Sequence, residues 1–396
     1  MNKEGAEMDF QLTDEQKMLK SMCRRLADEV FRPLADRWDK NEEEPMQNYE
    51  ILAKNGLAGI TIPEEYGGAG GKVFDAVLAM EEIARVCPVT AGFMLGNCVS
   101  AEMILTFGTE EQKMKYVPPM PKGEKIVAWA MTEPEAGSAA TELKTKALLD
   151  GGDYVLNGSK IFITRGTVAD AYIVFTRVGD CAGAKGIASF IVDRSAPGFT
   201  VGKAERTMGF KGAGSCSLFF DDCRVPKSAM MTKPGMFGKI MRGLNIARCL
   251  NPTFCLGIAQ GAFDLAVEYS KQRKQFGKEL CEFQGLQWML ADMAIKIDAM
   301  RLLIYRAAHS VGANLSEGPL HAAIAKTYAN EAAFEVVNVA LQIHGANGYS
   351  CEYPLERMLR DVRAYQIAGG SAQILRNLIA SLVLNRRFEQ RKQSQV

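Results

Sequence analysis

The sequence has few histidines and no arrangement of residues typical of a metal site. Only three histidines, His309, His321 and His344, occur among 396 residues, and they are scattered through the last third. A histidine cluster or a serine–histidine triad is therefore hard to build. The ten cysteines form no Cys-x-x-Cys pair, which disfavours a zinc site. We expect no metal, and we expect most cysteines to be buried small hydrophobic residues rather than disulfide partners.

The sequence also lacks an excess of charge of either sign and a long apolar run. Lys and Arg number 47 against 46 Asp and Glu, which gives a formal net charge of +1. A surface for nucleic acid or for an anionic membrane needs a basic excess, so we expect neither partner. No apolar run approaches the ~20 residues of a membrane helix, and the start "MNKEGAEMDF" shows no signal-peptide core. We expect a cytoplasmic protein.

The hydrophobic period changes twice along the chain. Residues 1–125 show helical spacing, and Thr13 with Gln16 and Thr109 with Gln112 have the spacing of capping boxes. Residues 126–235 contain short apolar runs between turn signals, namely "IVAWAM", "YVLNGSKIFIT", "AYIVFTR", "IASFIVD" and "CSLFFDD". Residues 236–396 return to helical spacing, in long segments such as 283–313 and 321–343. These patterns predict an α+β protein with a helical domain, a barrel-like β domain and a helical bundle.

Five sequence blocks occur in a fixed order along the chain. They are "WAMTEPEAGS", "LNGSKIFIT", "QRKQFGK", "EFQ" and "YPLERMLRDVRAYQIAGGSAQILR". This set resembles the acyl-CoA dehydrogenase family over nearly the whole chain. The resemblance implies the acyl-CoA dehydrogenase fold, with a C-terminal four-helix bundle and with FAD between that bundle and the β domain. It also implies an acyl-CoA substrate, a homotetramer, and electron-transfer flavoprotein as an electron partner.

The resemblance assigns ligand contacts to residues at matching positions of these blocks. Small residues let backbone amides approach phosphates, and hydroxyl groups can serve the flavin ring. Arg273 and Phe276 match residues that reach the FAD of a neighbouring subunit. The implied FAD contacts are Met131, Thr132, Ser138, Phe162, Thr164, Arg273, Phe276, Gln284, Gln342, Gly345, Gly370, Ser371 and Gln373. The implied substrate contacts are Ser138, Asn245, Arg248 and Gly369, although Arg248 could instead form an ion pair on a helix surface.

Two positions hold residues that cannot perform the chemistry of this family. Its members remove an α-proton with a glutamate, which either directly precedes the glycine matching Gly370 or directly precedes the arginine matching Arg248. Here those places are Gly369 and Ala247, and neither side chain can accept a proton. A positioned general base contributes about 10²–10⁴ in rate. We leave the catalytic base unassigned. The proton could pass to the substrate's own carboxylate, to bound water or to a displaced side chain, for which Tyr365, Cys249 and Glu102 are candidates by their place in the motifs.

The blocks "GSAA", "IAGG" and "EFQGLQWM" resemble a branch of the family that includes 3-sulfinopropionyl-CoA desulfinases. These enzymes release sulfite without dehydrogenation, so they need no α-base. The arginine that holds the sulfinate in that branch would fall near Gly92, and the nearest arginine, Arg85, is expected to form a surface ion pair. If Gly92, Ala247 and Gly369 face one pocket, the missing side chains predict a wide acyl cavity for a branched, cyclic or aromatic acid.

Three functions remain open from the sequence. The first is an FAD enzyme that oxidises or reduces an acyl-CoA across Cα–Cβ with a displaced proton donor. The second is a non-redox lyase or desulfinase with the same fold. The third is a non-catalytic subunit that completes the FAD site of a related partner in a mixed tetramer. We favour the first, because most members of the family are redox enzymes.

Overall fold

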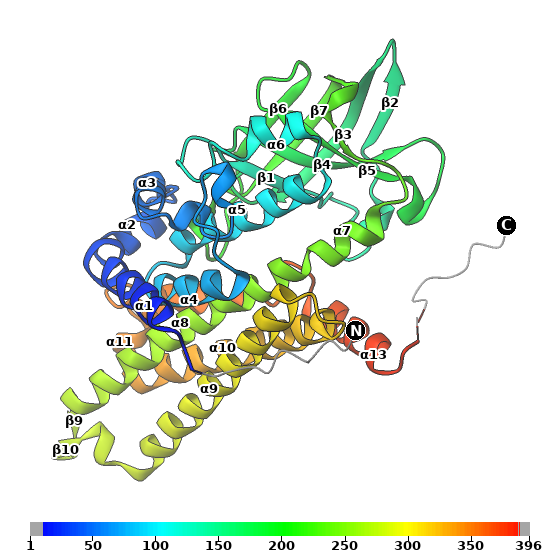
Figure 1. Ribbon diagram of the computed structural model, residues 1–396. Helices are drawn as coiled ribbons and strands as arrows, with labels where there is room; N and C mark the ends of the chain where they lie inside the picture. The colour runs from blue at the N-terminus through cyan, green and yellow to red at the C-terminus, as the bar shows by residue number, and fades with distance from the viewer. Residues whose placement is uncertain (1–10, 387, 389–396) are drawn as a thin grey trace.

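The computed structural model describes residues 11–386 and 388, and it begins with a group of helices (Figure 1). Both expected capping boxes are confirmed, with Gln16 N donating to Thr13 Oγ1 at 3.3 Å and Gln112 N to Thr109 Oγ1 at 3.2 Å. The start of the chain, on which the signal-peptide argument rested, lies outside the described residues. The helices are α1 (Asp14–Leu26), α2 (Ala35–Lys40), α3 (Met46–Lys54), α4 (Val73–Ala84), α5 (Pro88–Phe107) and α6 (Glu110–Tyr116).

The middle of the chain forms one mixed sheet. Its order is β6-β7-β3-β2-β4-β5-β8, and β1 pairs with β4 in parallel. The expected apolar runs coincide with β1, β3, β4, β5 and β7, whereas β2 and β6 were not expected. Most side chains of those two strands are not buried, so neither strand shows an apolar alternation. The strands are β1 (Val127–Ala130), β2 (Lys146–Asp150), β3 (Asp153–Ile163), β4 (Ala171–Val178), β5 (Ile187–Asp193), β6 (Phe199–Ala204), β7 (Cys216–Pro226) and β8 (Met230–Thr232).

The rest of the described chain is helical and forms the predicted bundle, which confirms the α+β fold class. Helices α8, α9, α10 and α13 are its main members, and α10 packs on the other three. A short hairpin, β9 (Lys274–Gln275) and β10 (Lys278–Glu279), connects α8 to α9. The helices are α7 (Phe237–Gly243), α8 (Asn245–Gln272), α9 (Gln284–Gly312), α10 (Gly318–His344), α11 (Ala346–Tyr349), α12 (Leu355–Ala364) and α13 (Ala372–Val383).

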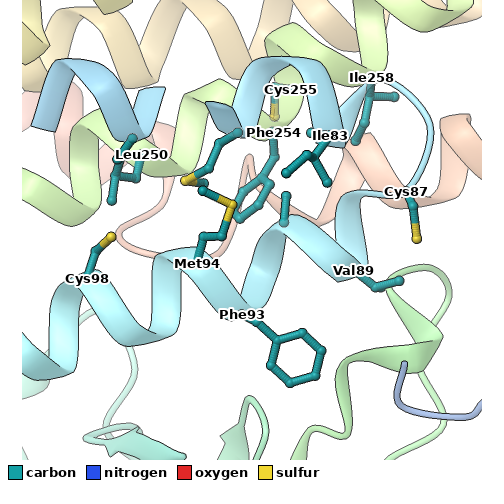
Figure 2. Close-up of a cluster of buried hydrophobic side chains, with 14 of the residues drawn as sticks. Ile83, Cys87, Val89, Phe93, Met94, Cys98, Leu250, Phe254, Cys255 and Ile258 are labelled. Carbon is teal, nitrogen blue, oxygen red and sulfur yellow. The ribbon is translucent and has the colours of Figure 1, made fainter. Parts of the chain in front are cut away.

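Helix α5 corrects the expectation that no apolar run reaches the length of a membrane span. By length and composition this 20-residue helix could cross a membrane, with a mean hydropathy of 1.3. It lies instead inside the protein, with 67% of its apolar window buried. Figure 2 shows Met94 of α5 pointing toward Phe254 of α8 and Ile83 of α4, whereas Phe93 points to the other side of α5. Because the helix is covered on several sides, its composition is apolar all round.

The cysteines behave as expected in the described part of the chain. All ten are free thiols, and most are buried, including Cys249 and Cys255 on α8. Burial raises the pKa of the Cys255 thiol to about 12. These cysteines therefore pack as small apolar residues.

The β domain is fixed to the bundle through the loop at residues 207–213. A Cβ added at Gly209 would lie only 2.4 Å from the carbonyl carbon of Arg360 on α12. The next amide, Phe210 N, donates to Asp361 Oδ1 at 2.6 Å, and burial raises the pKa of Asp361 to about 7. Arg360 Nη1 also donates to Met208 O at 3.0 Å. This junction places the β domain beside the loop that contains Gly369.

We predict that Gly261→Ala destabilises the protein. Its new methyl group would lie 2.1 Å from the carbonyl oxygen of Arg85, just after α4. Helices α4 and α8 would have to move apart, and overpacking of this kind costs about 1–3 kcal/mol of stability. Gly238→Ala on α7 is the control, since nothing lies within 4 Å of its Cβ position. Thermal unfolding checks this, and equal melting temperatures for the two variants would show that the α4–α8 contact adapts freely.

Candidate active site

The end of strand β3 presents the first group of predicted flavin contacts. Ile161 N donates to Thr132 O at 2.9 Å, which brings Met131 and Thr132 beside the end of β3. Phe162 and Thr164 are exposed, whereas the residues between and after them are buried. Phe162 is 58% exposed and has a φ of 56°, a left-handed conformation that is uncommon for an aromatic residue. This strand end therefore offers an aromatic face and two hydroxyl groups to a planar ligand.

The loop before α13 presents the second group. Gly369 and Gly370 have φ of 72° and 95°, which side-chain-bearing residues rarely adopt. Ser371 then caps α13, since its hydroxyl accepts from Ile374 N at 3.3 Å. The amino end of a helix with small residues before it favours a negatively charged group. Gln373 is exposed in the first turn of the same helix.

The third group lies at the other end of the bundle. Phe276 is 94% exposed in the β9–β10 hairpin, and Arg273 and Gln284 flank the hairpin with exposed side chains. Tyr269 stacks on His344 with ring centroids 4.1 Å apart, which holds the carboxyl ends of α8 and α10 together. Gln342 and Gly345 are exposed there as well. In Figure 1 this end lies far from α13 and from the sheet, so one chain does not bring all predicted FAD contacts together.

Two of the predicted CoA contacts, Asn245 and Arg248, lie at the start of α8. Arg248 Nη1 donates to Asn245 Oδ1 at 3.0 Å, and burial lowers the pKa of the Arg248 guanidinium. Within the described part of the chain no carboxylate pairs with Arg248, so the alternative of a surface ion pair is wrong. Ser138 is exposed in the loop after β1. A half-buried guanidinium without an anion beside it suits a phosphate or a carbonyl group.

A polar cluster lies next to Gly369, where most members of the family have the glutamate. It consists of Asn251, Lys326 and Asn330, and we call it the Lys326 cluster. A Cβ added at Gly369 would lie 3.4 Å from Lys326 Cε and 3.5 Å from Asn251 Nδ2. Lys326 Nζ donates to Gly370 O at 2.9 Å and to Tyr365 O at 3.2 Å. Asn330 Nδ2 donates to Asn251 Oδ1 at 3.2 Å. The sequence analysis missed this cluster, although two polar residues four apart on an apolar helix face were a usable signal.

None of the three candidate bases contacts the Gly369 position. The Tyr365 ring lies 4.9 Å from each of Phe210 and Phe254, and burial raises the pKa of its phenol well above the usual range. Burial also raises the pKa of the Cys249 thiol, which opposes formation of a thiolate. Glu102 accepts from Thr106 Oγ1 at 3.2 Å on its own helix. These contacts give Tyr365 and Cys249 packing roles.

The space beside Gly92 is filled, which corrects the expectation that this glycine widens the acyl cavity. A Cβ added there would lie 3.1 Å from Arg165 Nη2. Arg165 is 4% exposed and its guanidinium lies 3.6 Å from the centre of the Phe93 ring. Its Nη1 pairs with Glu44 Oε2 at 3.3 Å, while its Nε has no hydrogen-bond partner. An arginine therefore does reach Gly92, from the end of strand β3 rather than from α5.

Arg85 also differs from expectation. It forms ion pairs, but it is 6% exposed and so does not lie on the surface. It pairs with Asp28 Oδ1 at 2.5 Å and with Asp264 Oδ2 at 3.4 Å. These bonds connect the segment after α1 to α8, so Arg85 has a structural role at a helix junction.

A helical layer, a mixed sheet and a bundle around a glycine loop define a class of three-part flavoproteins. The N-terminal, middle and C-terminal acyl-CoA dehydrogenase domains match residues 13–124, 128–223 and 237–384. The butyryl-CoA dehydrogenase structure from Megasphaera elsdenii superposes with a TM-score of 0.92, at 38% identity, over 95% of this chain and 100% of that chain. The chain belongs to the acyl-CoA dehydrogenase family.

Two further relatives illustrate the range of this family. The chain is 43% identical over 391 residues to the 3-sulfinopropanoyl-CoA desulfinase of Paraburkholderia xenovorans, covering 97% of this chain and 99% of the relative. It is 37% identical over 377 residues to the caffeyl-CoA reductase–Etf complex subunit CarC of Acetobacterium woodii, covering 94% and 99%.

FAD is the cofactor, and oxidoreduction at a CH–CH bond is the reaction class of the family. The residues present fit this group. Phe162 offers an exposed aromatic face, Gly369 and Gly370 leave the backbone open in left-handed conformations, and the α13 amino end suits a phosphate. The residues that would hold FAD thus lie at the end of β3 and at the α13 loop, with the hairpin residues available to a neighbouring subunit.

We predict that Arg273→Ala weakens FAD retention, because the family resemblance implies that this residue contacts the FAD phosphate of a neighbouring subunit, and the change removes that charged contact. Wild type should purify yellow with about one FAD per chain, and the variant should lose FAD on dilution. Lys274→Ala, in the same exposed hairpin, is the matched control. The flavin-to-protein absorbance ratio after gel filtration measures the effect. Full FAD occupancy in Arg273→Ala would contradict a site shared between subunits.

Proposed function

We propose that this protein is an FAD-dependent enzyme that oxidises or reduces an acyl-CoA across Cα–Cβ without the glutamate usual in its family. One observation carries this proposal. Predicted flavin contacts at the end of β3 and at the α13 loop are exposed to solvent. The base position at Gly369 faces Lys326 and the Asn251 amide instead of a carboxylate. A dehydrogenase and a reductase among the similar proteins support both reaction directions.

In this proposal the protein side chains have separate tasks. Arg248, which donates a hydrogen bond to Asn245, binds the CoA part of the thioester. Thr132 and Thr164 would offer hydroxyl groups, and Phe162 an aromatic face, to the flavin ring. FAD, when bound, would supply hydride transfer chemistry for the substrate Cβ. The glycine pair at Gly369 lets the thioester approach the loop closely, because no side chain stands between them.

A second candidate function is release of an anionic β-substituent, as in the desulfinases. The observation that favours it is the Arg165 guanidinium beside Gly92, near the place expected for the sulfinate-binding arginine. Its Nε is buried without a partner, so one donor remains for an anion. Glu44 already pairs with the guanidinium, and this neutralisation makes the redox function the stronger candidate.

The proposal includes the partners of the protein. The exposed Arg273 and Phe276 at a bundle end far from the α13 loop support a closed homotetramer, in which each site is completed by a neighbour. The similarity to a reductase subunit of an Etf complex supports electron-transfer flavoprotein as the electron partner. A mixed tetramer with a related chain would use the same hairpin contacts. The balanced charge and free cysteines support a cytoplasmic location.

Anaerobic titration of the flavin spectrum tests the proposed function. We expect the oxidised flavin band to bleach with at least one acyl-CoA from a panel of straight, branched and aromatic esters, or the reduced flavin to reoxidise with the matching enoyl-CoA. Sulfite release from 3-sulfinopropanoyl-CoA without bleaching would favour the second candidate. No change with any ester, in protein purified alone, would contradict both and favour a mixed tetramer.

We predict that Ala247→Glu creates or raises oxidation of butyryl-CoA by up to about 10²–10⁴, since a positioned base contributes that much. Ala247 is half-buried on α8, one turn before Asn251 and thus on the side of the Gly369 loop. Gly369→Glu should give a smaller gain, because its φ of 72° strains a side chain that must also contact Lys326. Turnover with an artificial electron acceptor measures both. Fast wild-type oxidation of butyryl-CoA would show that a base already serves this substrate.

A further inference from the structure

We propose that Lys326 exchanges the proton with the substrate α-carbon, in place of the glutamate absent from Gly369 and Ala247. This inference rests on the proposed redox function and names the group that completes it. Lys326 comes from α10, an element on which the sequence motifs of the site place no base. It is the nearest titratable side chain to the Gly369 Cβ position, at 3.4 Å from Cε.

The position of Lys326 is set by the loop itself. Its Nζ donates to the carbonyl oxygens of Tyr365 and Gly370, at 3.2 and 2.9 Å, on either side of Gly369. A lysine nitrogen has three hydrogens when charged, so one donor remains after these two bonds. Lys326 is only 1% exposed, but a Cβ at Gly369 would make only ordinary contacts with Lys326 and Asn251, at 3.4 and 3.5 Å. The glycine therefore leaves room for a small group on the side of the loop that faces the lysine. A water molecule or a substrate α-carbon in that place would lie within reach of Lys326.

The surroundings of Lys326 favour proton exchange near neutral pH. Burial lowers the pKa of Lys326 to about 8, while Cys255 on α8 acts to raise it and Arg248 acts to lower it. The Tyr365 phenol belongs to the adjoining loop, and the Glu331–Arg376 ion pair lies farther along α10 and α13, exposed to solvent. Within the described part of the chain no carboxylate pairs with Lys326. A lysine in this state is present in both protonation forms at working pH.

The two asparagines of the Lys326 cluster act as positioning residues. Asn251 Oδ1 accepts from Asn330, which aims Asn251 Nδ2 at the Gly369 position, 3.5 Å from its Cβ. Asn330 Oδ1 is buried without a partner. An unpaired carbonyl oxygen, together with an amide donor beside the room that Gly369 leaves, suits a water molecule that carries the proton.

Lys326 takes part in both directions of the reaction. In oxidation, the Cα–H bond breaks and its proton passes to neutral Lys326 Nζ, directly or through one water. The electron pair left at Cα forms the new Cα–Cβ double bond as a hydride leaves Cβ for the cofactor. The products are the enoyl-CoA, reduced cofactor and a charged Lys326. In reduction, charged Lys326 returns the proton to Cα after hydride has reached Cβ.

Three variants test this step. Lys326→Met removes the proton and both loop bonds, whereas Lys326→Arg keeps a charged donor for the two carbonyls and cannot lose its proton. We expect both to lower turnover by about 10²–10⁴, with Lys326→Arg keeping wild-type FAD content. Adding Ala247→Glu to Lys326→Met should restore turnover. Wild-type turnover in Lys326→Arg would overturn the proposal, because a positioning role alone survives this change.

The pH profile separates proton transfer from loop support. Oxidation needs the neutral amine, so wild-type kcat/KM should rise as pH increases through about 8, and reduction should fall over the same range. The double variant that combines Lys326→Met with Ala247→Glu should lose the change in kcat/KM near pH 8. Its pH profile should instead depend on the pKa of the new carboxylate. A wild-type profile that is flat between pH 7 and 9 in both directions would overturn the assignment.

A third measurement needs no turnover and separates this inference from the proposed function. Lysine labelled with ¹³C at Cε titrates by NMR, and the Lys326 signal is identified by its loss in Lys326→Arg. We expect a pKa near 8 and a shift on binding a non-oxidisable acyl-CoA analogue. A normal lysine pKa overturns the inference even if the flavin bleaches. If no ester bleaches the flavin but Lys326 titrates near 8 and responds to the analogue, the redox function fails and the lysine site stands.

Discussion

The left-handed turn at Gly369 and Gly370 is the constraint on which the rest of the site depends. It brings the chain from α12 to the amino end of α13 without a side chain at the turn, and Lys326 holds it from below by bonding the carbonyl oxygens of Tyr365 and Gly370. A glutamate in this turn would be strained by its φ, and its Cβ would contact Lys326 Cε at 3.4 Å. The turn that lacks the glutamate is therefore the same turn that the buried Lys326 contacts and stabilises.

The packing around this turn explains how distant segments meet there. The loop at 207–213 of the β domain packs on α12 through Gly209 and Asp361, which carries the end of β3 to the same side of the bundle. Arg165 occupies the gap between β3 and α5, beside Gly92. A charged group therefore lies beside Gly92, whereas a lysine and an amide lie beside Gly369.

The order of helices, strands and bundle could be predicted from periodicity, because long buried helices such as α10 and buried strands such as β4 repeat their apolar residues regularly. The strands β2 and β6 could not, since their exposed side chains leave no apolar alternation. The empty base positions were visible at Gly369 and Ala247. The residues that fill their surroundings were not, because Lys326 and Arg165 approach from segments far away in sequence, and only packing shows which distant side chains occupy a space.

The structure of the FAD complex with a non-oxidisable acyl-CoA analogue tests the central claim most directly. The account predicts that the substrate Cα lies over Gly369, with Lys326 Nζ about 3 Å away or connected to it through one ordered water. It also predicts that no protein carboxylate contacts Cα. A carboxylate of the protein or of the ligand in contact with Cα, with Lys326 bonded only to the two loop carbonyls, would contradict the account.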